Sequence, residues 1–239
     1  MKRFWQAASV VEIEGGCGGG YESGYGVRLD DRPLNTPAKR RAIVPQRAVA
    51  EAMAAEWQDA PETIDPLAMP VTRAVNVTLD RVIAERAEVA ARIAAYGQSD
   101  LVCYRADHPQ GLVARQAAAW DPLIAWLAMQ GAPLTPVAGI MHVAQPPESL
   151  ARLAARIEAL SPWELTPLHE LVSLSGSLAI GLAVAEGELG APEAWRRSRI
   201  DEDWNIEQWG EDAEAAALAA RHEASFLAAA RLLELVRVE

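Results

Sequence analysis

The stretch SLSGSLAIGLA, residues 173–183, carries small residues at close spacing and leaves no polar face for water. A helix without a hydrophilic face is buried on all sides. Small residues also allow the backbones of neighbouring helices to approach closely. We therefore expect this segment to lie at the centre of a helical core.

Amphipathic stretches surround this segment in the sequence. Apolar residues recur at three- and four-residue spacing over 75–93, 112–127, 150–160 and 218–233, which predicts helices there. Ser161-Pro162 is typical of a helix start, whereas Asp121-Pro122 predicts a kink or a restart within its helix. We further expect one helix from Trp195 to Trp209 that ends at Gly210. Residues 134–145 are expected to be extended, with pairing to an N-terminal sheet as one option.

The first 66 residues have a different pattern. β-branched residues near 10–13 and 27–29 are bounded by Gly and Asp/Pro clusters, which predicts a hairpin or small meander with a flexible glycine-rich loop at 15–20. One amphipathic helix with Val49, Met53 and Trp57 follows, and prolines then force turns. The predicted fold class is α+β: a small N-terminal β-containing domain, residues 1–66, followed by a larger C-terminal α-helical bundle, residues 67–239.

Composition excludes several classes of function. The net charge of −11 disfavours binding to nucleic acid or to anionic lipid. Cys17 and Cys103 form no disulfide or zinc pattern, which is typical of a reducing compartment. No signal or transit peptide is visible, and the longest uncharged apolar run, 171–185, is too short and too rich in Ser and Gly to span a membrane. We expect a cytoplasmic bacterial protein without membrane insertion.

No motif in the chain indicates catalysis or a cofactor. The four histidines are scattered, the serines do not form a nucleophile elbow, and the glycines do not form a phosphate-binding loop. The densest polar segment is the acidic cluster 201–214, which follows Arg196, Arg197 and Arg199. Such carboxylates could bind a divalent cation, but a charge run of this kind is also typical of a solvated helix face.

Tryptophans lie among these charges. Trp195, Trp204 and Trp209 fall in or beside the acidic segment of a chain that has eight Trp and two Phe. Tryptophan is enriched at binding hot spots because it combines a large apolar area with one hydrogen-bond donor. Core packing is the alternative for Trp204 and Trp209, and both remain open. Trp120 and Trp126 are expected to be core residues.

Several segments, in order along the chain, resemble one family. They are GYGVRLDDRPLNTPAKRRAIVP (24–45), AEAMAAEWQ (50–58), DPLAMPVTRAVNVTLDRV (65–82), SDLVCYRAD (99–107), RQAAAWDPLIAW (115–126), SLAIGLAVAEGEL (177–189) and DEDWNIEQWGEDAEA (201–215). Together they are similar to the mitochondrial and alphaproteobacterial chaperones that escort the ATP synthase alpha subunit. The glycine-rich segment 15–20 departs from that family's pattern.

The resemblance implies a function without catalysis. It implies that the chain binds free ATP synthase alpha subunit and masks its beta-contacting surface until assembly, as a monomer when free and with no cofactor. The partner-binding residues implied by motif position are Trp57, Glu202, Glu207, Trp209, Gly210 and Asp212. Trp209 would be an anchor, the carboxylates would set register, Gly210 would allow a helix break, and Trp57 would either contact the client or support the fold.

Two other classes remain open at this stage. One is a carboxylate-dependent metal-binding enzyme that uses the acidic cluster 201–214. The other is a homo-oligomer that places its Trp-rich face against a second copy.

Overall fold

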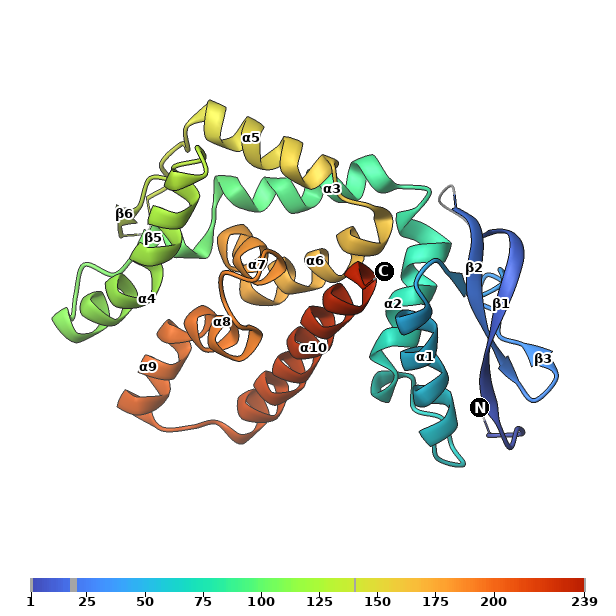
Figure 1. Cartoon of the computed structure of the whole chain (residues 1–239). Coiled ribbons are helices and arrows are strands. Elements are labelled where there is room, and N and C mark those ends of the chain that lie inside the picture. Colours follow the sequence, from blue (N-terminus) through green and yellow to red (C-terminus); the bar gives the residue numbers. More distant parts are fainter. Residues whose placement is uncertain (1, 18–20, 140, 239) are drawn as a thin grey trace. The chain divides into compact units, whose positions relative to one another are not determined.

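The computed structural model of this chain describes residues 2–17, 21–139 and 141–238, and it leaves the side chains of 15–22 undescribed. The chain forms two compact units. The first comprises Met1–Arg86, Ser161–Pro167 and Arg231–Glu239, and the second comprises Ala87–Leu160 and Leu168–Ala230. Strands near the N-terminus and a helical remainder confirm the predicted α+β class (Figure 1). The first unit extends past residue 66, and the predicted boundary between 66 and 67 stays a prediction.

The first unit is built on an antiparallel hairpin. β1 (Ala8–Cys17) pairs with β2 (Tyr21–Leu29) from Ala8↔Leu29 to Cys17↔Tyr21, which confirms the predicted hairpin. β3 (Arg32–Pro33) and β4 (Ile43–Val44) both pair with β2. Of the predicted loop 15–20, residues 18–20 lie outside the described part of the chain.

One face of this sheet is covered by α1 (Arg47–Asp59) (Figure 1). Val49, Met53 and Trp57 of the predicted amphipathic helix are buried here. The Glu56 carboxylate accepts the backbone N–H groups of Val71 and Thr72 at 2.7 and 2.8 Å, so it caps the start of α2 (Pro70–Val77). A carboxylate suits this position because the first N–H groups of a helix have no partner within the helix.

The predicted apolar stripe 75–93 is not one continuous helix. α2 leads into a π-helical turn, η2 (Thr78–Val82), and α3 (Arg86–Ala95) follows. In the turn, the Thr78 hydroxyl donates to the Ala74 carbonyl and bonds the Thr166 hydroxyl at 2.6 Å. Such turns are seen as local irregularities inside helices, and apolar spacing alone does not reveal them.

The second unit is formed mainly by helices. They are α4 (Gln110–Met129), α5 (Pro147–Glu158), α6 (Pro162–Ser175), α7 (Leu178–Ala185), α8 (Ala191–Ser198), α9 (Ile200–Trp209) and α10 (Ala213–Arg237), with the first turns of α6 and the end of α10 counted in the first unit. α7 is buried along almost its whole length, as the segment 173–183 predicts. None of the helices that the structure describes is long and apolar enough to cross a membrane.

The central segment 173–183 lies in two helices and is interrupted between them. Gly176 has a φ of +67°, which ends α6 after Ser175. The Ser177 hydroxyl then accepts the Ile180 N–H at 3.0 Å and starts α7. Glycine tolerates this left-handed backbone, whereas a residue with a Cβ is strained there.

A buried carboxylate fixes this junction. Asp100 is fully buried and accepts hydrogen bonds from the Ser177 hydroxyl at 2.5 Å, the Ala179 N–H at 2.9 Å and the Val102 N–H at 3.1 Å. It therefore joins the short helix η4 (Leu101–Cys103) to the start of α7. Burial raises the pKa of Asp100 to about 6, against the opposing effect of these hydrogen bonds.

Three further expectations need correction. The segment 134–145 contributes β6 (Val137–Ala138), which pairs in parallel with β5 (Tyr104–Arg105) of the same unit and not with the N-terminal sheet. Of the kink or restart expected at Asp121-Pro122, the restart is absent, because α4 continues through Pro122 with buried residues on both sides of the proline. The helix expected from 195 to 209 is divided at Arg199 into α8 and α9.

The start of α6 and the break at Gly210 are confirmed. Ser161 accepts the Glu164 N–H at 3.3 Å, and the Glu164 carboxylate accepts the Ser161 N–H at 3.1 Å. This reciprocal pair is a capping box, with Pro162 at the first helical position.

Candidate functional site

The predicted site residues 202–212 lie on α9 and on the turn into α10. Side chains of α4 bind one side of α9 through hydrogen bonds. The Gln116 side chain donates to Asp201 at 2.6 Å, and the Arg115 guanidinium forms two hydrogen bonds of 2.6 and 2.7 Å with Glu207. Hydrogen bonding to Arg115 lowers the pKa of Glu207, so this carboxylate is held in its ionised form.

Trp204 belongs to the same contact. Its ring lies over Gly111 of α4, where an added Cβ would come within 2.7 Å of Cη2 of the indole. The Arg115 guanidinium lies 4.8 Å from the ring centroid, a cation–π distance. Trp204 is partly buried and packs α9 onto α4, so its contacts favour packing of the two roles left open.

The turn after α9 is set by a glycine and an aspartate. Gly210 has a φ of +89°, a backbone conformation that favours glycine after a helix. Asp212 then accepts the Ala215 N–H at 2.8 Å through its side chain and the Ala216 N–H at 2.9 Å through its carbonyl. It is therefore the N-cap of α10, in addition to any part in binding.

Between α8, α9 and the first turns of α10 lies a groove of about 410 Å³, which we name the α9–α10 groove. Its lining residues are Trp195, Arg199, Asp203, Asn205, Ile206, Trp209, Gly210, Glu211, Asp212, Ala215, Ala216, Ala219, Ala220 and Glu223. The alanines recur along one side of α10 and present only methyl groups to the groove. Four carboxylates and one guanidinium line the groove, so it is negatively charged.

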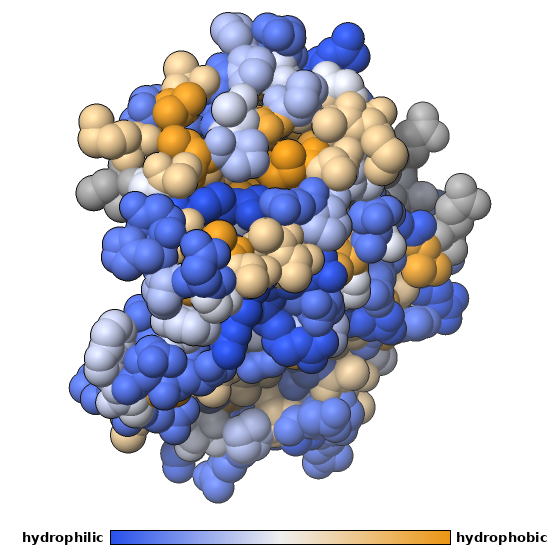
Figure 2. Space-filling model, turned by 90° about the vertical axis from the view of Figure 1, so that its left-hand side faces the viewer, coloured by the Kyte–Doolittle hydropathy of each residue, from blue (hydrophilic) through white to orange (hydrophobic). Residues whose placement is uncertain are grey.

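Trp209 is the large apolar side chain at this groove that is most open to water, with 80% of its surface exposed. In the space-filling view of Figure 2, hydrophobic side chains occur in groups separated by hydrophilic ones, as is normal for protein surfaces. A largely exposed tryptophan beside an alanine-lined groove is less usual, because tryptophan is mostly buried on average.

The carboxylates of the groove differ in their surroundings. Burial raises the pKa of Asp203, while Arg199, whose Nε lies 3.6 Å from Asp203 Oδ1, opposes that shift. The side chains of Glu211 and Glu223 have no hydrogen bond or ion pair with any residue that the structure describes. Glu202, exposed on α9, is likewise unpaired within the described ranges and does not line the groove.

The six predicted residues therefore separate into groups. Trp209, Gly210 and Asp212 meet at the groove, whereas Glu202 and Glu207 lie elsewhere on α9. Trp57 belongs to the first unit and is only 8% exposed. Its ring makes an edge contact with Trp5 at 5.1 Å, and its carbonyl accepts the Trp5 indole N–H at 3.0 Å. Of its two predicted roles, these contacts favour support of the fold.

Sequence reasoning missed the α4 side of this site. Arg115 and Gly111 are 92 and 93 positions away from Glu207 and Trp204, respectively, so no local pattern connects them. The alanines of α10 that line the groove recur at helical spacing in the sequence. Alanine is so common in this chain that this spacing did not distinguish them from other alanines.

Within residues 2–17, 21–139 and 141–238, no three His, Cys, Asp or Glu side chains come together in a way that could hold a metal ion. The carboxylates of 201–214 instead spread over α9, the turn and α10. The alternative of a metal-dependent enzyme at this cluster therefore has no geometric support.

Comparison with known proteins agrees with this picture. A crystal structure of Atp12 from Paracoccus denitrificans is 44% identical and superposes with a TM-score of 0.91 over 99% of this chain and 98% of that one. A crystal structure of a protein from Agrobacterium tumefaciens is 40% identical, with a TM-score of 0.92 over 99% of this chain and 86% of that one. Among curated proteins, the mitochondrial protein atp12 of Schizosaccharomyces pombe is 22% identical over 223 residues, 88% of this chain and 74% of that protein.

The family model described as ATP12 chaperone protein matches residues 2–128. Since that model covers more than half of the chain, and since the Paracoccus structure matches nearly all of it, this chain belongs to the ATP12 chaperone family and has the role of an assembly chaperone.

Proposed function

We propose that this chain binds the free alpha subunit of ATP synthase and covers the surface that alpha later presents to the beta subunit. The observation that carries the proposal is Trp209, 80% exposed beside the α9–α10 groove, in a member of a chaperone family. The resemblance of residues 24–215 to chaperones of the alpha subunit supports the choice of client.

The physical need for such a protein is clear. A subunit made before its neighbour exposes the apolar surface intended for that neighbour, and large exposed apolar patches aggregate. A chaperone that covers the patch keeps the subunit in solution and is displaced when the proper partner binds more tightly. This work requires a binding surface and no bond making, so no catalytic group is needed.

The groove has the composition of a binding hot spot. Trp209 offers a large rigid ring and an indole N–H, and tryptophans of this kind carry a large share of binding energy at protein interfaces. Ala215, Ala216, Ala219 and Ala220 form a shallow apolar floor next to it. We assign Trp209 as the anchor that inserts between client side chains while client residues pack on the floor.

The carboxylates contribute in different ways. Glu202, Glu211 and Glu223 are free of intramolecular partners in the described part of the chain, so they are available to steer a basic client surface. Glu207 is already held by Arg115 and acts by positioning α9. Gly210 and Asp212 set the direction in which α10 leaves α9.

The test is titration of purified alpha subunit with the wild-type chain and with Trp209→Ala. We expect Trp209→Ala to weaken binding at least about tenfold, because truncating an anchor of this kind costs more than about 1.4 kcal/mol. Leu218→Ala is the control, since Leu218 is an exposed apolar residue of α10 that does not line the groove.

Two results would count against the proposal. If the wild-type chain shows no affinity for alpha, the client is wrong. If alpha binds but Trp209→Ala and Leu218→Ala both retain wild-type affinity, the client stands and the groove is not its site.

A further inference from the structure

The sheet of the first unit has a second face, opposite to the one that α1 covers. Side chains alternate between the two faces of a strand. In β1, Ala8 and Val10 pack against the core beneath α1, so Val11 and Ile13 point to the opposite face. The same alternation places Arg28 of β2 on that opposite face, because Val27 and Leu29 are buried in the core.

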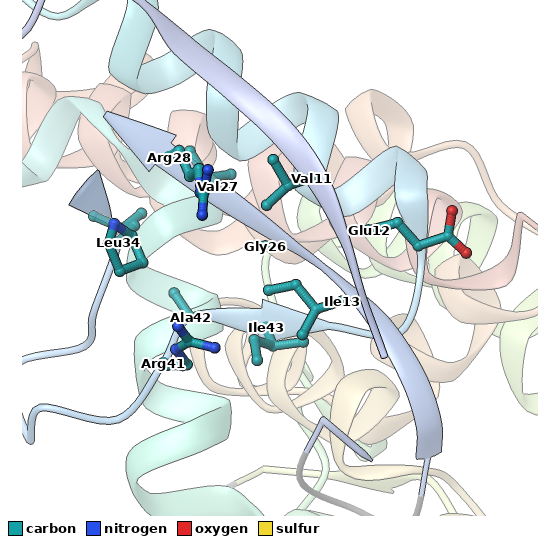
Figure 3. Close-up of a pocket in the computed structure, with 11 residues that line it drawn as sticks. Val11, Glu12, Ile13, Gly26, Val27, Arg28, Leu34, Arg41, Ala42 and Ile43 are labelled. Carbon is teal, nitrogen blue, oxygen red and sulfur yellow. The ribbon is translucent and has the colours of Figure 1, made fainter. Parts of the chain in front are cut away.

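This opposite face is hollowed at a glycine. Gly26 pairs with Val11 on one side and with Ile43 on the other. A Cβ at Gly26 would come within 2.7 Å of Ile13 Cδ1, so the absent side chain leaves space that Ile13 partly covers. The hollow has a volume of about 310 Å³, and Figure 3 shows Val11, Ile13 and Ile43 around Gly26. We name it the sheet hollow.

Apolar side chains lie at the base of the sheet hollow, which is unusual for the outer face of such a sheet. An antiparallel sheet with one face on the core normally carries polar residues on the other face. On this outer face, β1 instead carries Val11 and Ile13, and β4 carries Ile43, all of which are β-branched and apolar. Val11 and Ile13 are half-buried, and Ile43 is buried.

Two arginines give the sheet hollow its charge. Arg28 and Arg41 both line it, and neither guanidinium makes a hydrogen bond or ion pair with another residue in the described ranges. The one carboxylate in the lining, Glu12, points away from the group in Figure 3. The hollow is therefore a basic site on a chain whose net charge is −11.

From this combination we infer that the sheet hollow is a second contact site for the client, and that it receives a segment with an apolar side chain flanked by carboxylates. The apolar side chain would lie over Gly26, and its acidic neighbours would pair with Arg28 and Arg41. Charge complementarity selects this occupant, since unpaired guanidinium groups bind carboxylates through two parallel hydrogen bonds. The identity of the client rests on the function proposed above. The chemistry of the occupant rests on the hollow alone.

The experiment measures the affinity of purified alpha subunit for two kinds of variant. Val11→Thr combined with Ile13→Thr keeps the β-branched shape of both side chains while making the hollow polar. Arg28→Glu and Arg41→Glu, tested singly, reverse the charge at positions that hold no intramolecular partner among the described residues. Thermal unfolding of each variant establishes that the fold is intact.

Matched controls separate local from general effects. Leu67→Thr changes an exposed apolar residue of the first unit that lies outside the hollow. Arg152→Glu changes the net charge by the same amount as each arginine variant, at an exposed arginine of α5.

We expect the Thr double variant and each Arg variant to bind alpha at least about tenfold more weakly, with both controls within about twofold of wild type. Added salt should reduce the gap between wild type and the Arg variants, because salt screens exposed charges. Equal affinity of wild type and all hollow variants would overturn the inference and leave the proposed function intact. Failure of wild type to bind alpha would instead overturn the proposed function and the client assignment with it.

Sedimentation of the free chain measures whether it self-associates, and so tests whether a second copy of this chain occupies the hollow. If wild type self-associates and the Thr double variant is monomeric, the occupant is a second copy of this chain and the inference is overturned. A wild-type monomer that binds alpha through the hollow supports it.

Discussion

At the scale of single residues, the buried carboxyl group of Asp100 fixes the start of α7. Asp100 is fully buried, and its carboxylate accepts two backbone N–H groups and the Ser177 hydroxyl. No acidic pattern in the sequence distinguishes Asp100 from the exposed aspartates, since its partners at 177 and 179 are close only in the folded chain. The sequence could predict the buried helix α7 but not the group that anchors its first turn.

Asp100 makes stability depend on pH in a direction opposite to that of most carboxylates. Its pKa is raised to about 6 in the folded chain from 3.8, so the folded state binds the proton more tightly than the unfolded state. The contribution of this group to stability therefore falls as pH rises from about 4 to about 6 and is constant above. The total change is on the order of 3 kcal/mol, at about 1.4 kcal/mol per pKa unit.

Urea unfolding from pH 4 to pH 7 tests this expectation. The unfolding free energy of wild type should fall relative to that of Asp100→Asn as pH rises to 6. Asp100→Ala should lose about 3 kcal/mol at pH 7, because it leaves buried N–H and O–H donors without acceptors. Asp31→Asn, at an exposed position, is the control. A pH-independent difference between wild type and Asp100→Asn would show that the buried group does not titrate in this range.

At the scale of elements, helix starts and ends were largely predictable, whereas interruptions within helices were not. The capping box at Ser161 and the break at Gly210 follow from residue types with local backbone roles. The π-helical turn at Thr78–Val82 and the division at Arg199 leave the apolar spacing almost unchanged. Those features depend on tertiary contacts, to which periodicity is insensitive.

The start of α10 offers a test at this scale, because Asp212 is both the helix cap and part of the groove. Asp212→Ala should lower the unfolding free energy by about 1 kcal/mol through loss of the cap. Asp212→Asn retains an acceptor for the Ala215 N–H and should unfold like wild type. Its affinity for alpha should nevertheless fall a few-fold, since it removes one of the charges that face the client.

Chemical denaturation and titration with alpha subunit, run on the same two variants, separate the roles. Asp212→Asn with unchanged affinity would restrict Asp212 to capping. Asp212→Asn as unstable as Asp212→Ala would show that the hydrogen bond to Ala215 is not what stabilises the helix start.

At the scale of the whole molecule, the class of fold and the family could be predicted from the sequence, but the surfaces proposed here for binding could be predicted only in part. The position of Trp209 among charges left an interface and core packing both open, and the structure places this side chain, largely exposed, at a groove. Trp57 is buried in the first unit, and the half-buried Trp204 packs on α4 within the second unit. The difference between these tryptophans is set by contacts such as Trp204 on Gly111, which are distant in sequence.

The sheet hollow was missed for a related reason. Val11 and Ile13 are typical of a buried strand, and the spacing of a strand does not say which of its faces a helix will cover. Only the register of β1, β2 and β4 shows that Val11, Gly26 and Ile43 lie together on the uncovered face. The α9–α10 groove and the sheet hollow thus both depend on contacts between residues that are distant in sequence. The groove is negatively charged, whereas the hollow is basic.

The measurement that bears most directly on the chaperone function is light scattering of purified ATP synthase alpha subunit, diluted from denaturant with and without this chain. We expect an equimolar amount of wild type to keep scattering low, and an equimolar amount of Trp209→Ala to allow most of the aggregation seen with alpha alone. Alpha subunit that aggregates equally with and without folded wild-type chain would contradict the central claim that this molecule works by covering an exposed subunit surface.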